Sequence, residues 1–244
     1  MGQGILLSAG DNIDFMIHGV FSYELFGQTV WITTTHISVL IVMLLIIIFS
    51  CIASRVAKKA TEVPGKFQNV VEMIVEFLDG IIHNSMGKNA PKFRNYIGTI
   101  FIFIFISNIS GLLGLRPPTA DYGVTLPLGI ITFTLIWFNK IKHNKPKTLW
   151  VDMCSPLPPW LPIWLPINVI SEIAVPISLS LRLFANVLSG TVMMALVYGL
   201  LQYFALIWPA ALHVYFDLFS GAIQTYVFCM LTMTYISNAI GDEA

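Results

Sequence analysis

The chain has 244 residues, 56% of them hydrophobic and 11% charged, with a mean hydropathy of +0.78 and a formal net charge of zero. Water-soluble domains of this length are much less apolar, so the composition predicts a polytopic membrane protein. The balanced charge gives no indication of a nucleic-acid partner. The three cysteines are widely separated, which argues against a disulfide framework or a thiolate metal site, and we expect no metal and no cofactor.

The N-terminal part, residues 1–32, is mixed and polar, and its lack of Lys and Arg predicts an extracytoplasmic N-terminus. The following apolar run, residues 33–54, has about the ~20 residues that a membrane-spanning helix needs. Arg55 and Lys58 come directly after it, so its C-terminal end is predicted to lie in the cytoplasm. Because no basic residue precedes this run, we expect it to remain in the mature protein rather than to act as a signal peptide.

The next segment, residues 64–87, has the pattern of an amphipathic helix. Apolar side chains recur at helical spacing, namely Phe67, Val70, Val71, Ile74, Leu78, Ile81 and Ile82, and polar ones fill the opposite face, namely Gln68, Glu72, Glu76, Asp79 and His83. Such a helix is predicted to lie along the cytoplasmic interface rather than to cross the membrane. We interpret its acidic residues and its histidine as a solvated face rather than a catalytic cluster.

Two further membrane helices are predicted at residues 95–115 and 124–140. The first carries Asn108 in its apolar run, and an outer loop with Arg116 and Asp121 separates the two helices. Lysines gather where the second helix ends, at Lys140, Lys142, Lys145 and Lys147. This basic cluster predicts the same orientation as the first membrane helix does.

The last part of the chain is predicted to form a long helical hairpin, residues 167–207 and 210–240, after a connection rich in Pro and Trp at residues 152–166. Both apolar stretches exceed one perpendicular crossing, so they are predicted to be strongly tilted or near-horizontal. The fold class is therefore an all-α polytopic membrane protein, a single membrane domain with about five membrane helices, one interfacial amphipathic helix and a cytoplasmic C-terminus.

Arg182 is the first candidate functional residue, because no other charged residue occurs between Ile173 and Leu212. An isolated Arg near the middle of a bilayer costs about 3 kcal/mol on insertion scales, so it normally faces a partner or water. Three polar residues share its helix face: Ser178, Asn186 and Ser189. The alternative interpretation is a structural anchor, in which Arg182 is permanently paired to a carboxylate of the same chain.

A second polar stripe is predicted on the returning helix, where Asp217, Ser220, Gly221 and Gln224 share one face. Two long helices joined by a short turn are expected to be antiparallel, so the stripes can build a water-accessible seam. Arg182 and Asp217 should lie at different distances from the turn, and we expect them to have separate partners. His213 and Asp217, four residues apart, could hold a metal in an intramembrane enzyme, but the facing stripe offers no third ligand.

Four segments resemble one known family, the membrane subunit a of F-type ATP synthases, called ATPase subunit 6 in mitochondria. The most specific are PISLSLRLFANVLSG at residues 176–190 and GAIQTYVFCMLTMTYIS at residues 221–237. VPGKFQN at residues 63–69 and NISGLLGLRP at residues 108–117 also fit, and the resemblance covers nearly the whole chain.

The resemblance implies a bacterial stator subunit of the cell membrane that is not catalytic by itself and contains two offset half-channels. Its implied partners are the rotating ring of c subunits, the peripheral-stalk b subunits, the lipid bilayer and the transported H⁺ or Na⁺. Arg182 then faces the ring carboxylates, and Asn186 and Gln224 match polar positions near it. Asp217 matches an ionisable position of the outward half-channel, whereas Thr191 stands where many members have Glu or His.

Two residue groups are predicted to line the half-channels. The outward one receives Asp217, Asn108, Asp121 and His213, and the inward one receives Glu172 and Asn168. A stand-alone ion channel or secondary transporter is the main competing interpretation, but it predicts an inverted repeat, and none is visible. An intramembrane enzyme would lack a third metal ligand, and a purely structural assembly subunit would leave the two deep charges unexplained.

Overall fold

A computed structural model describes residues 19–25, 28–58, 65–113, 116–144, 164–201 and 208–241. In this part of the chain five segments are helical, long and apolar enough to cross a membrane, which confirms the prediction of about five membrane helices. The N-terminal residues 1–18 and most of the predicted Pro- and Trp-rich connection lie outside the described residues.

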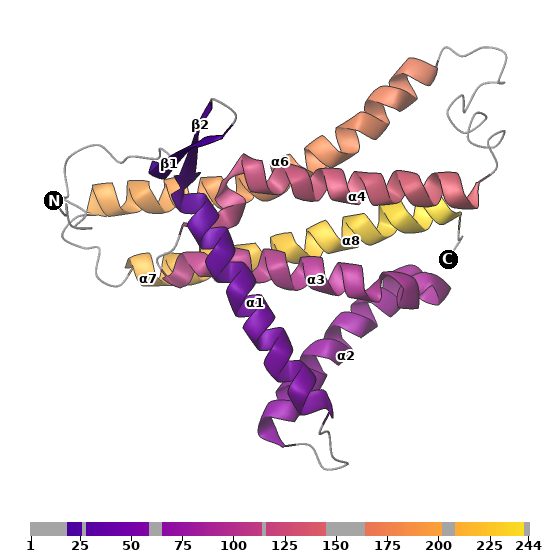
Figure 1. Cartoon of the computed structure of the whole chain (residues 1–244), viewed down its shortest axis with the longest axis horizontal. Helices are drawn as coiled ribbons and strands as arrows, with labels where there is room; N and C mark the ends of the chain where they lie inside the picture. Colours follow the sequence, from indigo (N-terminus) through magenta and orange to yellow (C-terminus); the bar gives the residue numbers. More distant parts are fainter. Residues whose placement is uncertain are drawn as a thin grey trace.

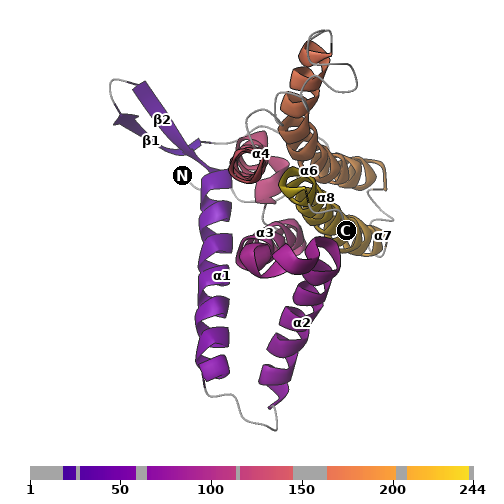
Figure 2. The ribbon, with the colours of Figure 1, turned by 90° about the vertical axis from the view of Figure 1, so that its right-hand side faces the viewer.

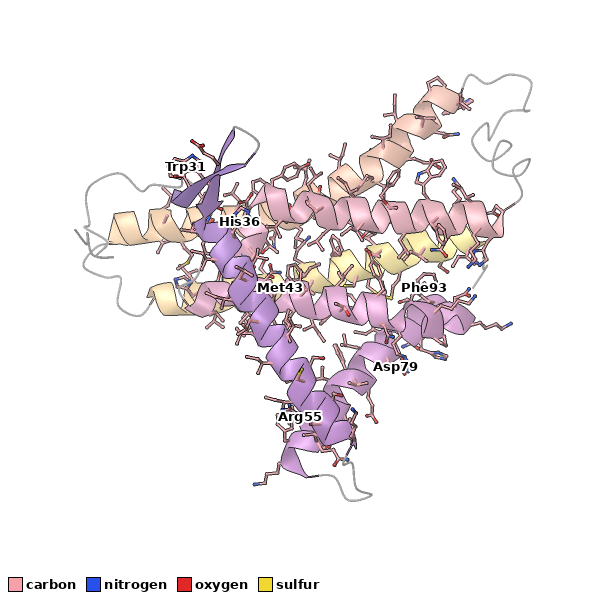
Figure 3. All side chains as sticks on the ribbon, viewed as in Figure 1. Trp31, His36, Met43, Arg55, Asp79 and Phe93 are labelled. Carbon is pink, nitrogen blue, oxygen red and sulfur yellow. The ribbon has the colours of Figure 1, made fainter. Side chains whose placement is uncertain are left out.

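A β-hairpin precedes the first membrane helix, and it was not predicted from the sequence. Strands β1 (Gly19–Leu25) and β2 (Gln28–Thr33) pair antiparallel. Both are rich in aromatic and β-branched residues, which favour strands. Helix α1 (Thr34–Lys58) follows directly, and Figure 3 shows Trp31 and His36 at its hairpin end and Arg55 at the opposite end.

Helices α1 and α2 (Lys66–Met86) project from the same side of the other helices, as Figure 2 shows. Only 11% of the most apolar part of α1 is buried within the chain. In α2, Leu78 and Ile82 of the predicted apolar stripe are buried, whereas Phe67 and Val70 near its start are exposed. The N-terminal half of α2 therefore offers its apolar side chains to surroundings outside the chain.

Four helices run side by side in alternating directions in Figure 1: α3 (Ala90–Ile109), α4 (Tyr122–His143), α6 (Leu165–Leu201) and α8 (Gly221–Ile240). Helix α8 contacts each of the other three. The central side chains have at most 2% of their surface exposed: Ile97, Ile104, Leu183, Phe228, Met233 and Ile236. Two short 3₁₀ helices, η2 (Ser110–Leu113) and η3 (Pro118–Ala120), lie between α3 and α4.

Helix α6 is continuous over 37 residues but contains Pro176, and Figure 1 shows it bending. A proline inside a helix removes one backbone hydrogen bond and is a common cause of a kink. The bend lies against α4 at Gly129, where an added Cβ would be 2.7 Å from the carbonyl oxygen of Pro176. The absence of a side chain at Gly129 therefore permits the close approach of α4 and α6.

The predicted second arm of the hairpin is divided into three parts. Residues 208 and 209, which lie between the two predicted arms, begin helix α7 (Trp208–His213). A π-helix, η4 (Val214–Ser220), continues into α8. π-Helical turns contain more residues than α-helical turns, so the side chains here depart from the predicted 3.6-residue spacing.

Candidate functional site

Arg182 lies on the exposed face of α6, opposite the core. Leu179 and Leu183 beside it are buried, with 3% and 0% of their surface exposed. No hydrogen bond or ion pair joins the Arg182 guanidinium to any residue that the structure describes. The expected intrachain carboxylate of a permanent anchor is therefore not found in the described ranges.

A shallow concave strip surrounds this arginine along α6. It is lined by Ala174, Ile177, Ser178, Leu181, Arg182 and Ala185. Apart from Arg182 these side chains are small or apolar, so the strip can accept a second helix at short distance. Arg182 would then be the one charge that such a helix meets on this strip.

The polar stripe of α6 divides between two faces. Ser178, Arg182 and Ser189 are exposed, while Asn186 turns toward η4. The Asn186 Oδ1 accepts a hydrogen bond from the Ser220 hydroxyl at 3.2 Å. The two predicted stripes therefore meet at this hydrogen bond.

Asp217 of η4 and His213, the last residue of α7, are joined by a side-chain hydrogen bond. The His213 Nδ1 lies 2.8 Å from the Asp217 Oδ2, and the two side chains are 33% and 14% exposed. A Cβ added at Gly111 would lie 3.1 Å from the carboxylate carbon of Asp217, so the carboxylate packs directly against the η2 backbone. Within the described segments, no group of three or more His, Cys, Asp or Glu could hold a metal ion.

The Thr191 hydroxyl does not contact the His213–Asp217 pair, because it donates a hydrogen bond to the Leu188 carbonyl of its own helix at 2.8 Å.

Gln224, one turn beyond Ser220, has 7% of its surface exposed. Its side-chain nitrogen has no acceptor among the described residues. The buried Gln224 amide is therefore a polar group with unused hydrogen-bonding capacity inside the bundle.

Asn108 connects α3 to α8 and to η3. Its side-chain nitrogen donates to the Gly221 carbonyl at 3.1 Å and to the Thr225 hydroxyl at 3.3 Å. Its side-chain oxygen accepts from the Thr119 hydroxyl at 2.7 Å. Asn108 is 2% exposed, and a Cβ at Gly221 would lie 2.9 Å from its Cβ. Asn108 is therefore a buried residue that joins α3 to α8 and η3 by hydrogen bonds.

Asp121 has a local structural role at the start of α4. Its carboxylate accepts a hydrogen bond from the Gly123 backbone nitrogen at 2.9 Å, as an N-cap residue does. The predicted outward residues thus belong to three separate contacts: the His213–Asp217 hydrogen bond, the buried contacts of Asn108 between helices, and the N-cap of α4 at Asp121.

Glu172 and Lys140 meet at the opposite end of the bundle. The Lys140 Nζ lies 2.5 Å from the Glu172 Oε1, and the pair lines a pocket of about 290 Å³ between α4, α6 and α8. Asn168 is one turn earlier on α6 and is partly buried. Lys140 was interpreted from the sequence only as a topology signal, and this contact was missed, since 32 positions separate the two partners.

Arg182 lies between these two polar regions along the bundle. Ten helical positions separate it from Glu172, which corresponds to an axial distance of about 15 Å. On the other side, Asn186 connects α6 to η4, the element that carries Asp217. The arrangement therefore has one exposed cation and two polar regions offset along the same helix.

Comparisons with known proteins agree on one family. The family model described as ATP synthase A chain matches residues 36–237. ATP synthase subunit a, sodium ion specific, of Propionigenium modestum is 35% identical over 93% of this chain and 78% of its own length. ATP synthase subunit a of Bacillus subtilis (strain 168) is 32% identical over 93% of this chain and 100% of its own. The chain therefore belongs to the ATP synthase A chain family, the subunit a of the ATP synthase membrane sector.

Proposed function

We propose that this chain is the ion-translocating stator subunit of an F-type ATP synthase and that Arg182 separates two offset half-channels. The observation that carries the proposal is the position of Arg182 on an exposed, otherwise small and apolar face of α6. A buried charge pair would not need such a face, whereas a helix of a rotating ring can pass along it. The ring carboxylates are then the acidic partners of Arg182.

The fixed positive charge of Arg182 explains how ion flow is coupled to rotation of the ring. A guanidinium remains protonated at any physiological pH, so it favours the ionised form of a carboxylate that comes close to it. The carboxylate therefore releases its ion on one side before it passes Arg182. The same fixed charge opposes direct passage of a cation between the half-channels, and ion flow requires rotation. Each elementary charge that crosses 100 mV supplies about 2.3 kcal/mol for that rotation.

The two polar regions supply the half-channels. On the outward side, Asp217 and His213 form the ionisable pair, and Asn108 and Asp121 shape the surrounding elements. On the inward side, Glu172 lines the pocket near Asn168. Asn186 and Gln224 are the polar groups between the outward pair and the ring-facing side of α6.

Length and charge support a multi-pass location in the bacterial cell (inner) membrane. Helix α6 has 37 residues, a length of about 55 Å, which is nearly twice the ~30 Å hydrocarbon core, so it is inclined. Basic residues end α1 and α4, at Arg55, Lys58, Lys140 and Lys142, which supports an outer N-terminus and a cytoplasmic C-terminus. The exposed apolar faces of α1 and α2 are available to lipid and to peripheral-stalk b subunits. The transported ion is H⁺ or Na⁺.

Disulfide cross-linking tests the ring-facing surface. Cysteines replacing Ser178 and Ala185, which are exposed on the strip, should cross-link to cysteines on the ring helices in the assembled complex. A cysteine replacing Ser180, which has 0% of its surface exposed, is the matched control and should not cross-link. Cross-linking from Ser180 but not from the strip would overturn the assignment of this face.

Sided labelling tests the half-channels. Cysteines replacing Asp217 and Glu172 should react with a small hydrophilic thiol reagent from opposite sides of the membrane. Reaction of both from the same side would refute two offset paths, even if the ring-facing surface were correct.

A further inference from the structure

The pocket at the basic end of the bundle combines one ion pair with several oxygen donors. Lys140 and Glu172 are its charged lining residues, with charged atoms 2.5 Å apart and side chains 17% and 25% exposed. Tyr235 and Asn238 of α8 line the same pocket. A carboxylate, a phenol oxygen and a carboxamide oxygen are hard ligands, the class that binds Na⁺ and other hard cations.

Lys140 satisfies one oxygen of the Glu172 carboxylate. The other oxygen, Oε2, is buried and has no hydrogen-bond donor among the residues that the structure describes. Buried acceptors that carry charge are normally satisfied, so Oε2 can accept a bond from water or coordinate a cation inside the pocket. The carboxylate therefore has the capacity to hold a second positive species beside the ammonium.

The Lys140 ammonium is held in place by its own helix. Lys140 belongs to the last turn of α4, where the helix dipole favours cations. Its Nζ also lies 5.8 Å from the centroid of the Trp137 ring, within the range of a cation–π interaction. A group tethered near its partner acts at an effective concentration of roughly millimolar or more. Together with the direct contact to Glu172, this holds the ammonium at the carboxylate oxygen that a free monovalent cation would otherwise occupy.

We propose that Lys140 is a specificity-determining residue that acts as a tethered counter-ion and keeps Glu172 from retaining a free monovalent cation. This inference rests on the proposed function, in which ions pass this pocket on the inward side of Arg182. The ammonium neutralises the carboxylate, so a passing ion is not trapped there. Removal of the ammonium alone converts the pocket into a Na⁺ site formed by Glu172 with the Tyr235 and Asn238 oxygens.

Carbodiimide modification of Glu172 in the assembled complex tests this site without relying on ion transport. The reagent attacks protonated carboxyl groups, and peptide mass spectrometry measures the modified fraction at mildly acidic pH in NaCl or in choline chloride. In Lys140→Met, Na⁺ at about ten times its dissociation constant should slow modification about tenfold, since about a tenth of the sites stay free. In the wild type and in Lys140→Arg, which keeps the cation, NaCl and choline chloride should give equal rates.

Gradient-driven ATP synthesis in vesicles is the second readout. Lys140→Met should be inhibited by Na⁺ on the cytoplasmic side and relieved by choline, and the double variant Lys140→Met with Glu172→Gln should lose this Na⁺ dependence. Equal modification rates in NaCl and choline for Lys140→Met would overturn the inference. If Lys140→Met does not assemble, Lys140→Gln takes its place with the same expected outcome. Na⁺ protection of Glu172 without any effect on synthesis would support the site and refute the inward path of the proposed function.

Discussion

Substitution of Gly129 by alanine tests the close approach of α4 to the bend of α6. The added Cβ would lie 2.7 Å from the Pro176 carbonyl oxygen and 3.2 Å from the Ser180 Cβ. The nearer atom belongs to the backbone of a kinked helix, so it cannot rotate away as a flexible side chain does. The two helices must therefore separate or tilt, and Gly129→Ala is expected to destabilise the bundle.

The size of the effect follows from two opposing contributions. Overpacking of a tightly packed contact costs about 1–3 kcal/mol. Replacement of a glycine inside a helix by alanine returns about 0.5–1 kcal/mol. When the two lower values are combined, and likewise the two upper values, the net destabilisation is about 0.5–2 kcal/mol, which corresponds to an increase of about 2- to 30-fold in the population of opened molecules.

The cysteines of the chain provide the assay. Cys229 of α8 is a free thiol with 2% of its surface exposed, and it belongs to the core formed by α2, α3, α6 and α8. Its alkylation by N-ethylmaleimide in the detergent-solubilised complex requires opening, so the rate should rise about 2- to 30-fold in Gly129→Ala. Cys51 of α1 is free and exposed and serves as an internal reference with an unchanged rate.

Gly98 provides the matched control. It is also a helical glycine, but an added Cβ would meet no atom within 4 Å. Gly98→Ala should therefore leave Cys229 protected at least as well as in the wild type, because only the gain in helix propensity remains. Equal alkylation rates of Cys229 in Gly129→Ala and Gly98→Ala would refute the reasoning.

Three further substitutions test individual contacts. Asn108→Leu removes two hydrogen bonds to α8 and should lower the stability of the bundle by about 1–2 kcal/mol. Cys229 alkylation should then accelerate about 5- to 30-fold. An unchanged rate would contradict the proposed contribution of Asn108 to helix packing. His213→Ala removes the hydrogen-bond partner of the Asp217 carboxylate at 2.8 Å. Because hydrogen bonds to charged groups contribute about 1.5–3 kcal/mol, gradient-driven synthesis should slow by at least about tenfold. Synthesis at the wild-type rate would argue against a role of this pair. Arg94→Ala breaks the exposed ion pair with Asp79, whose charged atoms are 2.6 Å apart. Because exposed pairs contribute about 0–1 kcal/mol, Cys229 alkylation should accelerate by at most about fivefold. A larger effect would show that this contact between α2 and α3 contributes more to stability than an exposed pair normally does.

The membrane helices could be predicted because long apolar runs are a strong signal in a sequence. Helix α1, Thr34–Lys58, overlaps the predicted residues 33–54, and α4, Tyr122–His143, overlaps residues 124–140. Both extend further into the basic residues, because lysine side chains can bury their aliphatic stems and keep the ammonium at the interface.

The β-hairpin and the π-helix could not be predicted by the same reasoning. The polarity and charge of residues 1–32 indicate a location outside the membrane but do not reveal the strand-forming residues of β1 and β2. The π-helical turn at Val214–Ser220 adds residues to a turn without changing the hydrophobic pattern. Its effect depends on a tertiary contact, the packing of Asp217 against Gly111.

The candidate site shows the same division. Arg182 could be singled out because a lone charge in an apolar run is costly. The partner of Glu172 could not, because Lys140 lies on another helix and its position at the end of a span also has a topological explanation. Likewise, the capping role of Asp121 and the three hydrogen bonds of Asn108 depend on neighbours that helical spacing does not identify.

The effect of Arg182 substitutions on ion leak and on gradient-driven ATP synthesis is the most direct test of the central claim. Both are measured in vesicles that contain the assembled complex. If Arg182 is the ion gate, Arg182→Lys stops synthesis, because an ammonium lacks the planar guanidinium fork and can lose its proton when desolvated. Arg182→Ala in addition makes the vesicles leaky to the coupling ion, because a loaded ring carboxylate can then pass between the half-channels. Normal coupled synthesis in either variant, with assembly intact, would contradict the account.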